Sequence, residues 1–190
     1  VRDRIRIYSH ARTPEACAHL ADKGVTAIKA YFPVGPRPLG ERVGGPRSVT
    51  VAEELAALEH LKRCREAVGN EVDLCHDAQA RYTTGAAIRM ANRLEEVGLL
   101  FFEEPVPPEN VEAMAKVRES VNVPICTGER RYTRFGFRDL IAMQAVDMIM
   151  PDVVRCGGIA ETKKIATMAE SYYMHRSEER RVGKECATGC

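Results

Sequence analysis

Residues 99–110 read LLFFEEPVPPEN, four large apolar residues followed by two glutamates and a proline. A short apolar run that is bounded by turn residues is typical of a buried strand. Gly98 precedes the run, and an amphipathic segment begins near Asn110. The sequence therefore predicts a strand over 99–102 that presents acidic side chains at its carboxyl end.

The same unit of apolar run, polar turn and amphipathic helix recurs on both sides of this stretch. Thr50 followed by Glu53 is a capping box that predicts the start of a helix, and glycines mark several helix ends. The predicted strands cover 4–8, 25–30, 72–75, 99–102, 123–126 and 147–150. The predicted helices cover 13–24, 50–68, 84–97, 110–120, 137–143 and 159–172.

Strands that alternate with helices predict parallel pairing through crossovers, either in a doubly wound sheet or in a (β/α)8 barrel. A Rossmann-type sheet requires a glycine-rich first turn, and SHAR at residues 9–12 does not supply one. The sequence therefore favours an α/β fold that is a partial TIM-type barrel of about six βα units, since a whole barrel needs eight units.

Composition restricts the class of function. A chain of 190 residues with 45% apolar residues can bury a core, and its formal net charge of +1 offers no field for nucleic acid or an anionic membrane. Seven cysteines without a CxxC pair argue against a disulfide framework and against a zinc knuckle. With neither an apolar leader nor a membrane-length apolar run, we expect a cytoplasmic protein with a small-molecule partner.

The last residues differ from the rest. Residues 176–190 read RSEERRVGKECATGC and show neither helical nor strand periodicity. We interpret them as a translated sequencing adapter, a non-native or disordered tail that follows a barrel domain at 1–175. A solvated charged tail and a basic nucleic-acid arm are the alternatives.

Acidic residues follow three successive predicted strands. Asp77, Glu103 and Glu129 come after the third, fourth and fifth strands, and both intervals are 26 residues. A single such residue would more often cap a helix, but three carboxylates at one barrel mouth would repel each other unless a cation lay among them. Oxygen ligands suit Mg²⁺. The pattern therefore predicts a magnesium site.

Four motifs in order resemble the mandelate racemase branch of the enolase superfamily, in particular its galactonate-dehydratase-like members. They are VRDRI (1–5), FFEEPVPPEN (101–110), TGERRYTRF (127–135) and PDVVRCGGI (151–159). The resemblance implies that Asp77, Glu103 and Glu129 bind Mg²⁺ and that Asp152 is the carboxylate of a His-Asp dyad. It also implies a barrel domain without its N-terminal capping domain and its last units, and a homo-oligomer when full length.

The activity that this resemblance implies is dehydration of a sugar acid such as an aldonate. A base removes the α-proton, and an enediolate forms before the β-hydroxyl leaves. The alternatives are a racemase or epimerase of a 2-hydroxy acid and a catalytically silent barrel that binds a sugar acid.

Three positions depart from the family pattern. Gln79 stands where related dehydratases have a histidine acid, and an amide can hydrogen-bond a leaving group but cannot protonate it. The second strand ends in Lys29-Ala30-Tyr31 rather than Lys-x-Lys, so Lys29 either holds the substrate or neutralises the acids. The dyad histidine is expected near position 179, which is Glu179. Without that base we expect the chain as written to be inactive.

Two other features have simpler interpretations. His76 should face away from Asp77 because side chains alternate along a strand, and we interpret it as a packing histidine. Residues 31–49 are rich in proline and glycine and contain Arg37, Arg42 and Arg47. They predict a mobile loop whose arginines either meet an anionic substrate or are solvated.

Overall fold

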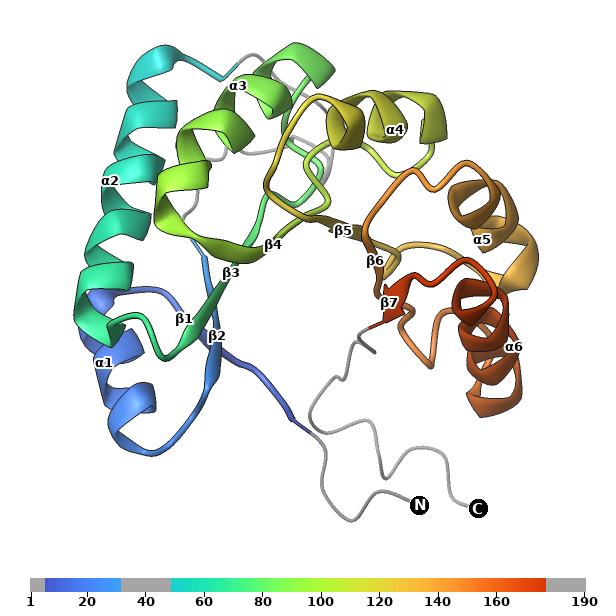
Figure 1. Cartoon of the computed structure of the whole chain (residues 1–190), viewed down its shortest axis with the longest axis horizontal. Helices are drawn as coiled ribbons and strands as arrows, with labels where there is room; N and C mark the ends of the chain where they lie inside the picture. Colours follow the sequence, from blue (N-terminus) through green and yellow to red (C-terminus); the bar gives the residue numbers. More distant parts are fainter. Residues whose placement is uncertain (1–5, 32–48, 177–190) are drawn as a thin grey trace, which may run out of the picture. The chain divides into compact units, whose positions relative to one another are not determined.

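The computed structural model describes residues 6–31 and 49–176. The chain forms two compact units, Val1–Ile125 and Cys126–Cys190. In both units β-strands alternate with α-helices (Figure 1). None of the helices in the described ranges combines the length and the apolar character needed to cross a membrane.

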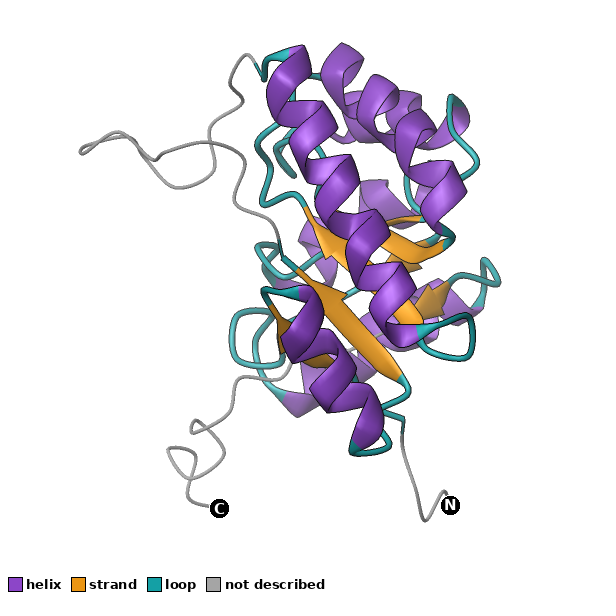
Figure 2. Cartoon of the chain, turned by 90° about the vertical axis from the view of Figure 1, so that its left-hand side faces the viewer, coloured by secondary structure: helices purple, strands orange, loops and turns teal. Residues whose placement is uncertain are grey.

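The first unit is a parallel sheet with helices on one of its faces (Figure 2). Its strands, which pair in chain order, are β1 (Ser9–Ala11), β2 (Ala27–Ala30), β3 (Asp73–Asp77) and β4 (Leu99–Glu103). Its helices are α1 (Pro14–Asp22), α2 (Val51–Val68), α3 (Thr84–Leu94) and α4 (Val111–Glu119). The core includes the buried residues Leu61, Leu74, Met90 and Leu94.

The second unit repeats the pattern. Its strands β5 (Ile125–Thr127), β6 (Met148–Ile149) and β7 (His175–Arg176) also pair in parallel and in chain order. Helices α5 (Thr133–Ala142) and α6 (Ile159–Glu170) pack against each other. Neither unit shows the reversal of strand order that defines a doubly wound sheet. The predicted fold class, a partial (β/α)8 barrel, is confirmed.

Local signals placed most elements correctly. The predicted capping box is present, since Thr50 Oγ1 accepts a hydrogen bond from the Glu53 N–H (3.3 Å) and the Glu53 carboxylate accepts one from the Thr50 N–H (2.8 Å). Asn110 and Thr13 likewise cap α4 and α1 with their side chains. The residue types that favour helix starts therefore fixed these boundaries.

The largest differences from the predicted ranges lie at the starts of β1 and α5. The first described strand is Ser9–Ala11, because pairing with β2 joins Ser9 to Ile28. Of the predicted strand 4–8, residues 6–8 are not in a strand, and residues 4–5 lie outside the described ranges. The side chain of Arg6 binds Asp73 (2.6 Å). Helix α5 begins at Thr133 rather than at residue 137. Its first turn is held by tertiary contacts, including a 2.9 Å hydrogen bond from the Arg134 N–H to Glu161, which offset the low helix propensity of a glycine within the helix.

Arg65 joins two connections of the first unit through its guanidinium group. The side chain leaves the last turn of α2 and donates hydrogen bonds to the carbonyl oxygens of Gly69 (2.8 Å) and Val72 (2.6 Å). It also donates to those of Val97 (3.0 Å) and Gly98 (3.0 Å), directly before β4. One cation therefore satisfies four carbonyl groups and ties the start of β3 to the start of β4.

We expect Arg65→Ala to lower the free energy of unfolding by about 2–3 kcal/mol, because these carbonyl groups lose a charged donor. Urea denaturation followed by circular dichroism measures the change. The control is Arg63→Ala, which removes an arginine that is 60% exposed and pairs with Glu59 at 3.8 Å; its effect should stay within about 0.5 kcal/mol. Equal effects of the two substitutions would contradict the role assigned to Arg65.

Candidate active site

Two of the predicted metal ligands end adjacent strands of the first unit. Asp77 is the last residue of β3 and Glu103 the last residue of β4, and the two are partners in the parallel register. Parallel strands carry their carboxyl ends to the same edge of a sheet, so both side chains start from one edge. The Glu103 side chain is only 1% exposed and that of Asp77 13%.

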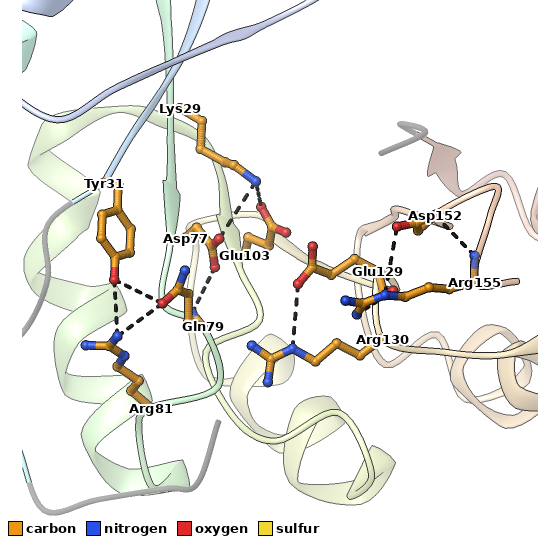
Figure 3. A network of polar contacts seen from close by, with 10 residues as sticks. All are labelled: Lys29, Tyr31, Asp77, Gln79, Arg81, Glu103, Glu129, Arg130, Asp152 and Arg155. Carbon is orange, nitrogen blue, oxygen red and sulfur yellow. Dashed lines mark hydrogen bonds and ion pairs between the residues drawn. The ribbon is translucent and has the colours of Figure 1, made fainter. Parts of the chain in front are cut away.

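Lys29 lies between these carboxylates. Its Nζ donates a hydrogen bond to Glu103 Oε2 (2.8 Å) and is 3.8 Å from Asp77 Oδ2 (Figure 3). The lysine side chain is only 2% exposed, and its ammonium group sits 5.3 Å from the centroid of the Tyr8 ring. Of the two roles predicted for Lys29, the contacts agree with neutralisation of the acids; a contact with substrate stays a prediction.

The donor set of this edge suits a hard divalent cation. Asp77 and Glu103 offer carboxylate oxygen atoms, the ligand type that such a cation prefers, beside the single ammonium group of Lys29. Within residues 6–31 and 49–176, no three His, Cys, Asp or Glu side chains gather closely enough to hold a metal ion. The third predicted ligand, Glu129, belongs to the second unit. The three-ligand magnesium site therefore stays a prediction.

Gly128 lies between the end of β5 and Glu129, and the local packing requires a glycine at this position. Gly128 has a φ of +144°, and a Cβ atom there would lie 2.9 Å from both the Met150 carbonyl oxygen and the Phe137 ring. A side chain larger than hydrogen would therefore displace the backbone that carries Glu129. The Glu129 side chain is partly exposed, and its Oε1 lies 3.6 Å from Arg130 Nε (Figure 3).

Asp152, the predicted dyad carboxylate, is buried just beyond β6. Its Oδ1 accepts hydrogen bonds from the backbone N–H groups of Val154 (2.8 Å) and Arg155 (3.2 Å), and Arg155 Nε lies 3.9 Å from Oδ2. These donors hold the carboxylate in a fixed orientation. Position 179, where the dyad histidine is expected, is Glu179 and lies outside the described residues, so the dyad stays a prediction.

Gln79 belongs to a small polar network at the carboxyl end of β3. Its N–H donates to Asp77 Oδ1 (2.8 Å), and its Oε1 accepts hydrogen bonds from Tyr31 Oη (3.0 Å) and from the Arg81 guanidinium (3.1 Å). Arg81 also donates to Tyr31 Oη (3.1 Å) (Figure 3). The backbone of Gln79 and Ala80 has φ values of +53° and +58°, a left-handed turn that brings the amide back toward Asp77.

Tyr31 and Arg81 are site residues that the sequence reasoning did not assign. Tyr31 entered only as a departure from the Lys-x-Lys pattern. The sequence did contain a signal for Tyr31. Residues two apart along a strand share a face, so Tyr31 is expected on the same face as Lys29. Nothing in the sequence indicated that Arg81 would reach across to this tyrosine.

His76 packs in the interior, as predicted. Its ring stacks on Phe102 with centroids 5.5 Å apart, and Nδ1 lies 3.1 Å from the Ala30 carbonyl oxygen. Burial lowers the pKa of His76, which favours the neutral ring. The predicted loop at 31–49, including its arginines, lies outside the described residues except at its ends.

We expect Lys29→Met to lower the free energy of unfolding by about 3–5 kcal/mol without metal, because it removes the buried ammonium group that donates a 2.8 Å hydrogen bond to the buried Glu103 carboxylate. Millimolar Mg²⁺ should restore part of the loss. Chemical denaturation with and without Mg²⁺ measures both effects. Lys62→Met removes an exposed lysine that pairs with Glu96 at 2.9 Å and should cost less than about 1 kcal/mol. Loss of stability that is equal in both variants would contradict the burial argument.

Comparison with known proteins places this arrangement in a family. The sequence profile of the enolase C-terminal domain-like family matches residues 12–178. The chain is 38% identical to the D-xylonate dehydratase of Haloferax volcanii over 184 residues, which is 91% of the chain and 44% of that protein. It is 32% identical over 192 residues to a D-galactonate dehydratase family member of Streptomyces bingchenggensis, with 90% of the chain and 47% of the relative covered.

Solved structures of similar proteins point to the same family. A mandelate racemase/muconate lactonizing enzyme-like protein from Roseovarius sp. TM1035 superposes with a TM-score of 0.86 and 32% identity over 94% of the chain and 48% of that protein. Another from Rubrobacter xylanophilus gives a TM-score of 0.84 and 36% identity over 98% of the chain and 54% of that protein. The fold is therefore that of the mandelate racemase-like barrel enzymes. The chain belongs to the enolase C-terminal domain-like family, and it spans about half the length of the curated relatives it matches.

Proposed function

We propose that the protein carrying this chain is a magnesium-dependent sugar-acid dehydratase, a hydro-lyase that acts on an aldonate-like substrate. The observation that carries the proposal is the pair Asp77 and Glu103, which end adjacent parallel strands and share the buried Lys29. The names of the relatives in Haloferax volcanii and Streptomyces bingchenggensis support the same chemistry.

In this proposal Asp77, Glu103 and Glu129 hold the metal ion. Bound Mg²⁺ supplies Lewis-acid stabilisation for the negative charge that develops on the substrate carboxylate as the α-proton leaves. Lys29 orients the Glu103 carboxylate through its 2.8 Å hydrogen bond. Its ammonium group also lowers the electrostatic cost of bringing an anionic substrate to an acidic edge.

Two proton transfers are required, and different residues serve them. Asp152 orients the histidine that removes the α-proton and stabilises its protonated form. Gln79 accepts hydrogen bonds but cannot donate a proton to the departing hydroxyl group. The hydroxyl donor bonded to Gln79 is Tyr31, and Arg81 stabilises the phenolate that would remain after proton transfer. We therefore assign Tyr31 as the proton donor and Gln79 as the residue that positions it.

A panel of aldonic acids incubated with Mg²⁺ and the full-length protein that contains this chain tests the proposal. We expect a 2-keto-3-deoxy acid, which carbonyl reagents detect, and loss of its formation with a chelator. Scrambling of the stereochemistry at C2 without loss of water would indicate a racemase or epimerase instead. Binding of an aldonate without turnover would indicate a silent barrel. The 190-residue chain alone should give no product, because it lacks the predicted base.

A further inference from the structure

Two loops of the second unit carry Glu129 and Asp152, and backbone hydrogen bonds tie these loops together. The strands before them, β5 and β6, pair in parallel, so both loops leave the same edge of the sheet. Beyond the strands, the Thr133 N–H donates a hydrogen bond to the Cys156 carbonyl oxygen (3.1 Å). The two site residues therefore belong to neighbouring loops whose backbones are already connected.

Arg155 contacts both of these site residues. Its backbone N–H donates a hydrogen bond to Asp152 Oδ1 (3.2 Å), and its Nε lies 3.9 Å from Asp152 Oδ2. Its Nη1 donates a 3.4 Å hydrogen bond to the backbone carbonyl oxygen of Glu129 (Figure 3). Different nitrogen atoms of one guanidinium group therefore face the carboxylate of one site residue and the backbone of the other.

Both side-chain contacts of Arg155 are long, so they matter for orientation more than for binding strength. An ion pair between exposed groups contributes little, because water screens it. The Asp152 side chain is only 2% exposed and that of Arg155 33%, so screening is weaker here than at the surface. The planar guanidinium group presents its N–H donors in a fixed fork. A group of this shape can hold two partners at a set separation.

We propose that Arg155 is a positioning residue that fixes the Asp152 carboxylate relative to the backbone of Glu129. The inference rests on the proposed function, in which Glu129 binds the metal ion and Asp152 orients the base. Removal of the α-proton requires the base to lie at a set distance from the metal site, and a misplacement of about 1 Å can cost roughly a hundredfold in rate. Arg155 sets that distance without touching the substrate.

A double-mutant cycle tests the contact without any activity. The full-length protein is unfolded in urea in its unmodified form, as Asp152→Asn, as Arg155→Met and with both substitutions. We expect the double variant to lose less of its urea midpoint than the sum of the two single losses, because either substitution breaks the pair. Arg138→Met is the matched control, since this guanidinium is 68% exposed and pairs with Asp139 at 2.8 Å. Its loss should add to that of Asp152→Asn, and additive losses for Arg155→Met as well would overturn the proposal.

Two substitutions of Arg155 in the full-length protein separate positioning from charge. In Arg155→Met we expect Mg²⁺ affinity and the rate of α-proton exchange each to fall about tenfold or more, while the KM for substrate changes less than about threefold. Arg155→Lys restores the positive charge, but its single nitrogen atom cannot hold both partners, so it should recover at most one of the two losses. Recovery of both by lysine would show that only the charge matters. A higher KM with unchanged exchange at saturating substrate would show that Arg155 binds substrate, and either result would overturn the proposal.

These measurements distinguish failure of this inference from failure of the proposed function. If the unmodified full-length protein neither binds Mg²⁺ nor exchanges the α-proton of any aldonate, the proposed function is wrong and the positioning role falls with it. The urea cycle still shows in that case whether Arg155 holds Asp152. If the unmodified protein does both and Arg155→Met retains both, the proposed function stands and the positioning role of Arg155 is wrong.

Discussion

Glu103→Gln should abolish measurable Mg²⁺ binding and lower dehydratase turnover roughly a thousandfold in the full-length protein. The substitution keeps the shape of a side chain that is only 1% exposed, but it removes a full negative charge from the proposed metal ligands. It also removes the carboxylate that Lys29 hydrogen-bonds at 2.8 Å, while Asp77 Oδ2 remains 3.8 Å from the ammonium group. The edge of the sheet would then carry too little negative charge for a divalent cation.

Isothermal titration with Mg²⁺ and steady-state turnover measure the two effects separately. Glu96→Gln is the matched control, because it makes the same chemical change at a side chain that is 55% exposed and pairs only with a surface lysine. That variant should bind Mg²⁺ and turn over substrate as the unmodified protein does. A Glu103→Gln protein that is folded and still binds Mg²⁺ with unchanged affinity would remove Glu103 from the metal site.

The fold was largely predictable because its signals are local. A threonine three residues before a glutamate fixes the start of α2, and the apolar run before Glu103 fixes β4. The errors arose where tertiary contacts, and not local sequence signals, determine where an element begins. The position of β1 depends on its register with β2, and the first turn of α5 depends on the bond from Arg134 to Glu161. Neither contact leaves a periodic pattern in the sequence.

The candidate site was only partly predictable from the sequence. The equal spacing of the acidic residues and the alternation of strands and helices placed Asp77 and Glu103 at neighbouring strand ends, as the register shows. The network of Tyr31, Gln79 and Arg81 was not predictable. It depends on a left-handed backbone conformation at Gln79, which is a non-glycine residue. Such a conformation has no reliable signal in the sequence.

The proposed mechanism also accounts for a glutamine at position 79. A histidine two residues after Asp77 could donate a proton directly, whereas Gln79 cannot. The hydrogen bonds from Tyr31 and Arg81 to Gln79 bring a phenol and a guanidinium to the same place. In the proposed mechanism, Tyr31 therefore offers an exchangeable proton within one hydrogen bond of Gln79.

Asp152→Asn should slow removal of the substrate α-proton by about 10³- to 10⁴-fold in the full-length protein, while Mg²⁺ affinity stays unchanged. The amide oxygen of asparagine can still accept the backbone N–H groups of Val154 and Arg155, so the turn after β6 should persist. The lost charge removes the stabilisation of a protonated histidine, and the amide can hold that ring in the wrong tautomer. We therefore expect the substitution to affect proton transfer and not metal binding.

Exchange of the substrate α-proton with solvent deuterium, followed by NMR, measures this step apart from the loss of water. Asp139→Asn is the control, because Asp139 is exposed and pairs with Arg138 at 2.8 Å. It makes the same change of charge in the second unit and should leave exchange unaffected. If Asp152→Asn exchanges the proton at the original rate and retains its fold, the buried carboxylate serves only to cap its turn, and the base must be oriented by another group.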